Sequence, residues 1–183
     1  PPLPEDWIQR LEKTRGWKRR WVFILDLRLQ TFYRDKSGGL RPVKDPDRVA
    51  IPIRDRDGDI VNIRLWCPTG GMPKIISWAK TTGSSRLFPP IPLYFDPRYS
   101  PPALDGVHPE ECLAPETVLL CEGESDTICA LSHGFNAITQ TTKLSKWPDD
   151  HLAVFKDRDV VIAYDADLPG LKYADHAARN LAG

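Results

Sequence analysis

The sequence predicts an α/β protein in which a parallel sheet with flanking helices follows a smaller, mixed α+β part. Strand-like and helix-like segments alternate over residues 116–183, which is typical of parallel strands joined by helices. Over residues 1–88 the clearest signal is instead an antiparallel hairpin. Eight prolines fall within residues 89–115, and this composition favours an irregular connector between the two parts.

The first part is expected to begin with a short amphipathic helix at residues 5–14, followed by a basic segment. Residues 21–34 are rich in residues that favour strands. Residues 48–66 predict a hairpin, because apolar residues alternate on both sides of an Asp-Gly turn. Within it Pro52 cannot donate a ladder hydrogen bond, which indicates an edge position or a bulge. Residues 73–78 predict a further strand.

The second part begins with an apolar run that is typical of a strand buried on both faces. A helix should follow and end near Gly134, which has the position of a C-terminal cap. Pro148 suits the first turn of the next helix. The expected strands are residues 118–121, 135–139 and 159–164, and the expected helices are residues 125–132, 148–155 and 169–181.

The net charge indicates no particular class of binding partner, because the sequence contains 25 Lys and Arg and 25 Asp and Glu. The charges are nevertheless uneven, since residues 10–20 hold six basic residues against one Glu. Four cysteines without a Cys-x-x-Cys pair indicate neither a zinc site nor a disulfide framework. No signal peptide or membrane-length apolar run is visible, so we expect a cytoplasmic protein without a membrane partner. We also expect a piece of a longer protein, because the sequence starts with Pro-Pro and stops within a helical pattern.

Acidic residues stand where two of the predicted strands end. Glu122 follows the first strand of the second part, and Asp165 and Asp167 follow the third. In open parallel sheets the functional crevice lies outside the carboxyl ends of the strands, so these three carboxylates should meet there. Like charges at close range repel unless a cation intervenes, and hard oxygen donors suit Mg²⁺ or Mn²⁺. The pattern therefore predicts a divalent metal site.

Each motif by itself also has a purely structural interpretation. Asp126 can act as a helix cap, as acids after a strand commonly do. Asp165 to Asp167, followed by Leu-Pro-Gly, can form a loop with an Asx turn. We favour the metal site because the acids occur together at two strand ends of one sheet.

The acidic motifs resemble those of the Toprim domain, which bacterial-type primases, type IA and type II topoisomerases and some nucleases share. The sequence EGESD follows one apolar strand, and VVIAYDADLPG carries the second motif, so the resemblance covers about the last third of the chain. By this resemblance Glu122 and Asp126 form the first motif, with Glu122 acting in chemistry or metal binding. Asp165 and Asp167 would bind Mg²⁺, and Gly170 matches the D-x-D-x-x-G form seen in primases.

The hairpin of the first part resembles the basic subdomain that precedes Toprim in bacterial and phage primases. There a hairpin of the form R-x-x-x-P-I-x-D-x-x-G is followed by a Pro-Lys-Tyr-like strand. The matching residues are Arg48, Pro52, Asp55, Gly58, Pro73 and Lys74. The sequence departs from the family where Arg64-Leu65-Trp66 replaces a Gly-Gly-Arg. It also ends before the third acidic motif and shows no zinc-binding module at its start.

Together the resemblances imply the catalytic core of a DNA primase, or of a primase-helicase, from a phage or a mobile element. Such an enzyme joins ribonucleotides on a single-stranded DNA template with Mg²⁺ or Mn²⁺, and Glu122 would be its catalytic residue. The implied metal ligands are Glu122, Asp126, Asp165 and Asp167. The implied contacts to template or triphosphate are Lys74, Arg54, Arg64 and Lys80. The implied partners are single-stranded DNA, nucleoside triphosphates and a replicative helicase in cis or in trans, and an isolated piece of this length need not be active.

Two other functions remain open. A Toprim nuclease would cut phosphodiesters with Glu122 as general base, although a nuclease has no need of the primase-like hairpin. A non-catalytic nucleic-acid-binding module of a replication protein would keep the fold, although the retained acids argue against lost activity. Trp17 and Trp21 stand in a basic segment that could stack on single strands, and we interpret them instead as core aromatics beside a basic surface.

Overall fold

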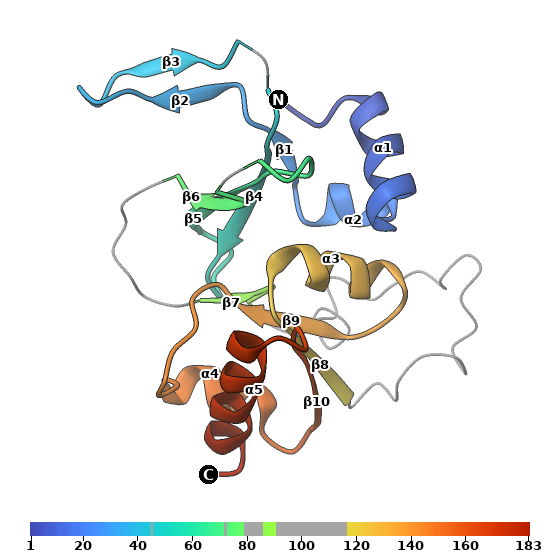
Figure 1. Ribbon diagram of the computed structural model, residues 1–183, viewed down its shortest axis with the longest axis vertical. Helices are drawn as coiled ribbons and strands as arrows, with labels where there is room; N and C mark the ends of the chain where they lie inside the picture. Colours follow the sequence, from blue (N-terminus) through green and yellow to red (C-terminus); the bar gives the residue numbers. More distant parts are fainter. Residues whose placement is uncertain (45, 72, 79–85, 91–116) are drawn as a thin grey trace. The chain divides into compact units, whose positions relative to one another are not determined.

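The chain folds into two compact units, which Figure 1 shows in a computed structural model. The first unit consists of Pro1–Ile53 and Asp59–Thr81, and the second of Arg54–Gly58 and Thr82–Gly183. The structure describes residues 1–44, 46–71, 73–78, 86–90 and 117–183. Most of the predicted proline-rich connector, residues 91–115, therefore lies outside the described residues, as does Lys80.

The first unit contains two helices, a four-stranded sheet and a separate two-stranded hairpin. The helices are α1 (Glu5–Arg15) and α2 (Arg19–Ile24). The four-stranded sheet has the order β1 (Arg28–Leu29), β4 (Val49–Arg54), β5 (Ile60–Trp66) and β6 (Ile75–Ser77). The separate hairpin pairs β2 (Phe32–Arg34) with β3 (Leu40–Pro42).

Most expectations for this unit are confirmed, and one is confirmed only in part. The first helix, the long hairpin and the strand after it are all present. β1 pairs only with Val49 and Ala50, so it ends before Pro52, as an edge position requires. Residues 21–34, which are rich in residues that favour strands, form strands at β1 and β2, whereas the stretch up to Ile24 is a helix that buries Trp21 and Val22. Strand propensity depends on packing context, and here burial of these side chains prevails over it.

Tryptophan side chains lie in the core of the first unit. Trp17, Trp21 and Trp66 are each at most 2% exposed. The rings of Trp17 and Trp66 lie 4.8 Å apart between centroids and are tilted by 32°. The guanidinium of Arg15 lies 5.0 Å from the Trp66 ring centroid, a cation–π contact at the border of the core. The interpretation of Trp17 and Trp21 as core aromatics is confirmed.

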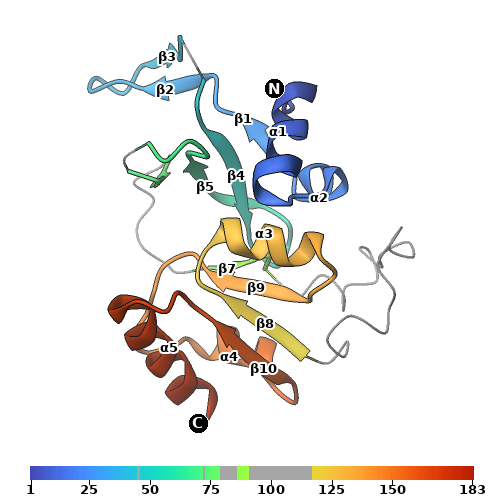
Figure 2. The ribbon, with the colours of Figure 1, turned by 45° about the vertical axis from the view of Figure 1, so that its right-hand side comes forward.

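The second unit is a sheet with helices on both faces. Its strand order is β10 (Asp159–Ala163), β8 (Thr117–Cys121), β9 (Ala137–Gln140) and β7 (Leu87–Phe88). The first three strands are parallel, and β7 adds to β9 antiparallel. Helix α3 (Glu124–Ser132) covers one face, and α4 (Asp149–Phe155) and α5 (Leu168–Leu181) cover the other, as Figures 1 and 2 show.

The predicted α/β class and the parallel sheet are confirmed, with β7 as an addition that the sequence did not predict. Gly134 has a φ of 88° and follows α3, as expected of a C-terminal cap. Val118 and Leu120 of β8 pack in one core cluster with Ile138 and Phe155. The strand that leads to Glu122 is therefore anchored by burial.

Among the described residues, no helix combines the length and the apolar character that crossing a bilayer requires.

Candidate active site

The carboxyl ends of β8 and β10 bring the two acidic motifs together. The parallel register pairs Ala163 with Cys121, so both strands end at the same edge of the sheet. From there Glu122 reaches across, and its Oε2 accepts a hydrogen bond from the backbone N–H of Asp165 at 2.8 Å. The carboxylate of the first motif thus contacts the loop of the second motif, although the two residues are 43 positions apart.

The loop of the second motif closes tightly on the start of α5. Asp167 Oδ1 accepts a hydrogen bond from Gly170 N at 2.7 Å and so caps the helix. A Cβ added to Gly170 would lie 2.1 Å from the backbone oxygen of Asp165, so any side chain there would displace the loop. This close approach is a physical reason for the glycine in D-x-D-x-x-G. The interpretation of this loop as a capping turn is therefore confirmed for Asp167 Oδ1, and the other carboxylate oxygen of Asp167 is not part of the cap.

Asp126 lies in the first turn of α3 and is exposed. It is not the N-cap, because that position belongs to Gly123, whose backbone is extended. Glu124, in the same turn, is 4% exposed. Acids in a first turn are stabilised by the helix dipole, so part of the negative charge here has a structural role.

The predicted convergence of three carboxylates is not seen. Among the residues that the structure describes, no three His, Cys, Asp or Glu side chains lie close enough to hold a metal ion together. Asp167 is turned toward its helix, and Glu122 accepts from a backbone amide. The donor chemistry still suits Mg²⁺ or Mn²⁺, because every candidate is a hard carboxylate oxygen. Glu122, Asp165, Asp167 and Asp126 would be the residues that hold such an ion.

Sequence reasoning missed a lysine at the same edge. Lys143 follows β9, and its Nζ donates a hydrogen bond to the backbone oxygen of Glu122. The same ammonium lies 4.2 Å from the centroid of the Tyr164 ring. Burial lowers the pKa of Lys143, while Glu122, Glu124 and Asp126 act against that shift. The signal available in the sequence is a basic residue just past the end of a predicted parallel strand.

Burial also shifts the pKa values of two groups beside this lysine. Burial raises the pKa of Tyr164, and it raises the pKa of the Cys121 thiol to about 12. Cys121 therefore stays protonated near neutral pH, as expected of a buried, unreactive thiol. The same burial strengthens the interaction of the Lys143 ammonium with the neighbouring carboxylates, because the effective dielectric constant is low.

The basic residues predicted to bind nucleic acid fall in both units. Lys74 and Arg64 belong to the first unit and Arg54 to the second. Lys74 is exposed and directly precedes β6. Arg64 Nη1 donates to Ser77 Oγ at 2.8 Å across the β5–β6 pair. Arg54 Nη1 donates to the backbone oxygen of Gly58 at 2.8 Å, so this arginine also braces its own turn.

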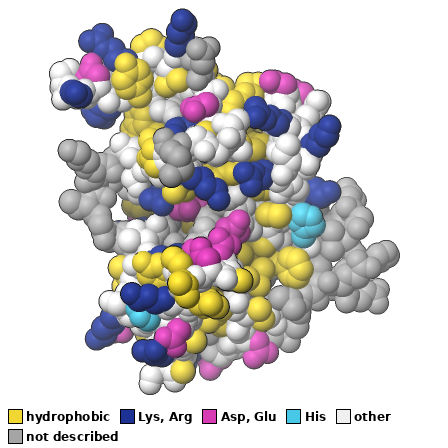
Figure 3. All heavy atoms as spheres, viewed as in Figure 1, with side chains coloured by type: hydrophobic (Ala, Val, Ile, Leu, Met, Phe, Trp, Pro, Cys, Tyr) yellow, Lys and Arg dark blue, Asp and Glu magenta, His cyan; other side chains and the backbone are white. Residues whose placement is uncertain are grey.

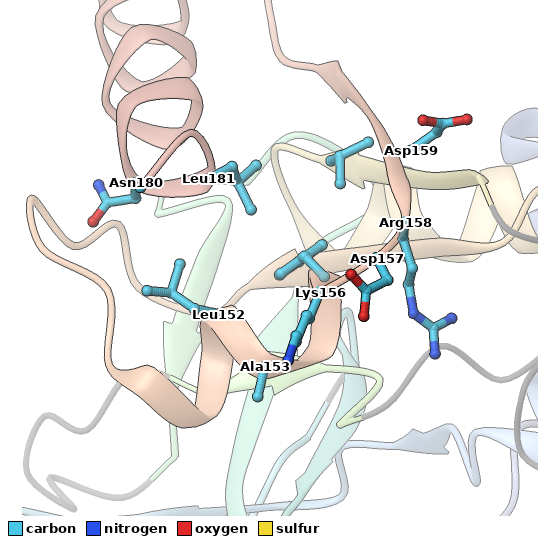
Figure 4. A pocket seen from close by; sticks show the side chains of 11 residues that line it. Leu152, Ala153, Lys156, Asp157, Arg158, Asp159, Asn180 and Leu181 are labelled. Atoms are coloured by element: carbon cyan, nitrogen blue, oxygen red, sulfur yellow. The ribbon is translucent and has the colours of Figure 1, made fainter.

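A large cavity of about 690 Å³ lies elsewhere in the second unit. Figure 4 shows it between α4, the end of α5 and the beginning of β10, with Leu152, Leu181 and Asp159 among its lining residues. Because Asp159 begins β10 and Asp165 follows its other end, this cavity lies away from the acidic motifs. The acids sit at an open edge of the sheet and not in this hollow.

No protein-family model and no curated protein matches the chain. Solved structures do match it. A DnaG primase catalytic domain bound to single-stranded DNA superposes with a TM-score of 0.65 at 18% identity, over 98% of this chain and 62% of that one. The Escherichia coli primase catalytic core superposes with a TM-score of 0.63 at 18% identity, over 94% of this chain and 59% of that one. A DNA primase domain from Pseudomonas aeruginosa superposes with a TM-score of 0.65 at 17% identity, over 98% of this chain and 60% of that one.

The chain has the fold of a primase catalytic core. It spans about three fifths of the length of these solved primase chains. The resemblance of the sequence to Toprim and to the primase core is therefore confirmed at the level of the fold. At such low identity the fold does not fix the chemistry, which depends on the individual side chains of the site.

Proposed function

We propose that the protein is the catalytic core of a DNA primase, which joins ribonucleotides on a single-stranded DNA template by metal-dependent nucleotidyl transfer. The shared fold supports the class of enzyme. One observation carries the proposal further. The Glu122 carboxylate, at the end of β8, accepts a hydrogen bond from the Asp165 amide at the end of β10. This contact joins the two acidic motifs at the edge where open parallel sheets act.

Glu122 is the residue proposed to stabilise charge or to transfer a proton. It leaves a strand with buried side chains on both faces, and a fixed backbone amide holds its carboxylate. A group held in this way needs little reorganisation during reaction. Asp126, Asp165 and Asp167 are proposed to hold a divalent cation together with Glu122. When bound, that cation would neutralise charge on the transferring phosphoryl group.

Nucleoside triphosphates and single-stranded DNA are the proposed substrates. One structural neighbour is a primase domain bound to single-stranded DNA, which supports the second of them. Exposed Lys74 is proposed to contact template or triphosphate, followed by Arg64, Arg54 and Lys80. A helicase in cis or in trans, and an origin in a phage or mobile element, are proposals that rest on the sequence resemblance alone. The same holds for the division into residues 1–88 and 116–183 as binding and catalytic parts.

Primer synthesis by the full-length protein tests the proposal. Glu122→Gln keeps the shape and the accepting oxygen of this side chain but removes its charge. We expect the rate to fall by at least about a hundredfold, as is typical when an acid–base or charge-stabilising group is lost. The matched control is Asp159→Asn, which removes an exposed acid at the other end of β10 and should leave the rate unchanged.

The outcomes separate the candidate functions. A Glu122→Gln protein that makes primers at nearly the wild-type rate overturns the mechanism proposed here. Metal-dependent cleavage of the template by the wild type, lost in Glu122→Gln and without primer synthesis, would instead identify a nuclease. Strand binding without either reaction, unchanged by Glu122→Gln, would identify a non-catalytic module.

A further inference from the structure

The β2–β3 hairpin, residues 32–42 and called the ribbon below, exposes its large side chains. Phe32, Tyr33 and Leu40 are 51%, 46% and 59% exposed, whereas Trp17 and Trp21 of the same unit are at most 2% exposed. Figures 1 and 2 show the ribbon extending away from α1 and α2 of its unit. Its apolar side chains therefore do not serve the core, and exposed aromatic residues of this kind commonly mark a contact surface.

Both faces of the ribbon combine an aromatic ring with an arginine. The register pairs Phe32 with Pro42, Tyr33 with Arg41 and Arg34 with Leu40. Residues directly opposite in an antiparallel pair share a face, and successive residues alternate between faces. One face thus carries Phe32 and Arg34 with the apolar Leu40 and Pro42, and the other carries Tyr33 opposite Arg41.

The ribbon carries a net positive charge. Its residues 32–42 include three basic residues, Arg34, Lys36 and Arg41, and one acid, Asp35. Figure 3 shows the basic and apolar side chains intermixed over this hairpin. Asp35 Oδ2 accepts a hydrogen bond from Arg41 Nε at 2.9 Å, so these two charges offset each other and the net positive charge comes from Arg34 and Lys36. Such a surface is complementary to a polyanion that also carries flat, apolar rings.

The turn of the ribbon is fixed before any ligand binds. Asp35 Oδ1 accepts hydrogen bonds from the backbone N–H groups of Ser37 and Gly39 at 3.0 and 2.9 Å, and from the Ser37 hydroxyl at 2.6 Å. Gly38 has a φ of 87°, which favours glycine. Arg34 Nη1 donates to the Gly38 backbone oxygen at 3.0 Å. A rigid hairpin presents its rings at a low entropic cost of binding.

We propose that the ribbon is a stacking platform for single-stranded nucleic acid, with Phe32 and Tyr33 stacking on bases and Arg34 and Arg41 contacting phosphates. Proteins that bind single strands combine these two elements, because every base has a π-face and every nucleotide a phosphate. The inference deepens the proposed function and rests on it for the identity of the strand, which would be the template. A protein partner is the competing occupant, and the arginine beside the aromatic ring on each face favours a polyanion over it.

Binding of a fluorescent 12-nucleotide single strand to the protein, followed by anisotropy, tests the proposal. Phe32→Ala/Tyr33→Ala should weaken binding at least tenfold while leaving the salt dependence unchanged, because bases and not phosphates lose contacts. The control Phe23→Ala removes a phenyl ring that is 60% exposed on α2 and should bind as the wild type does. Phe32→Tyr/Tyr33→Phe keeps both rings and should also bind normally.

An oligonucleotide with abasic positions makes the test specific for stacking. The wild type should bind the abasic strand more weakly than the normal strand, by about the same factor by which Phe32→Ala/Tyr33→Ala weakens binding of the normal strand. The double alanine variant should bind both strands equally. Equal binding by Phe32→Ala/Tyr33→Ala and Phe23→Ala overturns the platform, and so does a wild type indifferent to the missing bases. Either result leaves primer synthesis and its dependence on Glu122 untouched, so failure here is distinguishable from failure of the proposed function.

Discussion

The acidic edge of the second unit and the ribbon of the first unit place functional side chains in opposite ways. The acidic edge, formed by Glu122, Asp126, Asp165 and Asp167, lies where β8 and β10 end and where α3 and α5 begin, and the two strands are anchored in a core. The ribbon is a two-stranded hairpin whose strand residues are all exposed. At the acidic edge, a few charged side chains are held in place because the elements that carry them are buried. On the ribbon, the exposed side chains are held in place by the geometry of one hairpin turn.

This difference determines how each region should respond to substitution. If the acidic edge holds a divalent ion as proposed, its charges act on that one ion, so single changes there should have large effects. On a surface that binds a strand, each phosphate contact contributes separately, so single changes should be small and should depend on salt. The following experiments test this contrast from the largest expected effect to the smallest.

The largest effect is expected from Asp165→Asn/Asp167→Asn on metal binding. Two negative charges about 4 Å from a divalent ion attract it by roughly 2 kcal/mol each even at the dielectric constant of water. Mn²⁺ affinity without nucleotide, measured by electron paramagnetic resonance, should therefore fall at least a hundredfold. The fold should survive, because Asn keeps the oxygen with which Asp167 accepts from Gly170 N and is itself a favourable N-cap.

Thermal unfolding without metal serves as the control for that experiment. The double variant should be no less stable than the wild type, since it removes repelling charges and keeps the cap. Equal Mn²⁺ affinity of the two proteins would remove Asp165 and Asp167 from the metal site and leave them a structural loop.

Lys143→Met should have an intermediate effect, of opposite sign. The ammonium of Lys143 contacts the Glu122 backbone and faces the carboxylates of the first motif. A unit charge and a divalent ion about 6 Å apart repel by roughly 1.4 kcal/mol in water, so Mn²⁺ affinity should rise about tenfold. Lys143→Arg retains the charge and should bind Mn²⁺ as the wild type does.

Lys146→Met is the matched control for Lys143, since it removes an exposed lysine from the same loop. Its Mn²⁺ affinity should not change. A lower affinity in Lys143→Met would contradict the electrostatic account and would show that this lysine mainly holds Glu122 in position.

The smallest effect is expected from Lys74→Ala. Loss of one phosphate contact should weaken single-strand binding modestly and reduce the slope of log affinity against log salt by about 0.7. Anisotropy titrations at several salt concentrations measure this slope. An unchanged slope would assign Lys74 to the structure alone, and a hundredfold loss would contradict the expectation that a single phosphate contact contributes little.

Local patterns in the sequence were sufficient for the elements that carry the acids. An apolar run, a helical period and a capping glycine predicted β8, α3 and their order, because these signals depend on neighbouring residues only. The position of the acids at one edge of the sheet was predictable because β8 and β10 are parallel and end at the same edge. Residues 21–24 are helical despite their preference for strands, because α2 is stabilised by burying Trp21 and Val22, which propensity does not include.

The orientations of the acidic side chains were beyond prediction. Residues two apart on an extended chain point to one side, which led to the expectation that Asp165 and Asp167 converge. The chain instead turns into α5 at Asp167, and the free N–H groups of the helix capture one of its oxygens. Lys143 was missed for a similar reason, since only the pairing of β9 beside β8 brings it to Glu122.

The sequence by itself thus determined the class of fold, the order of its elements and the strand ends at which the acids stand. Tertiary structure decided which side chains are exposed and what each charge contacts. Trp17 and Phe32 are both aromatic residues near arginines in the sequence, yet one is buried against Trp66 and the other faces solvent. Their difference arises because burial depends on what the rest of the chain packs against a residue, and a local pattern carries no record of that packing.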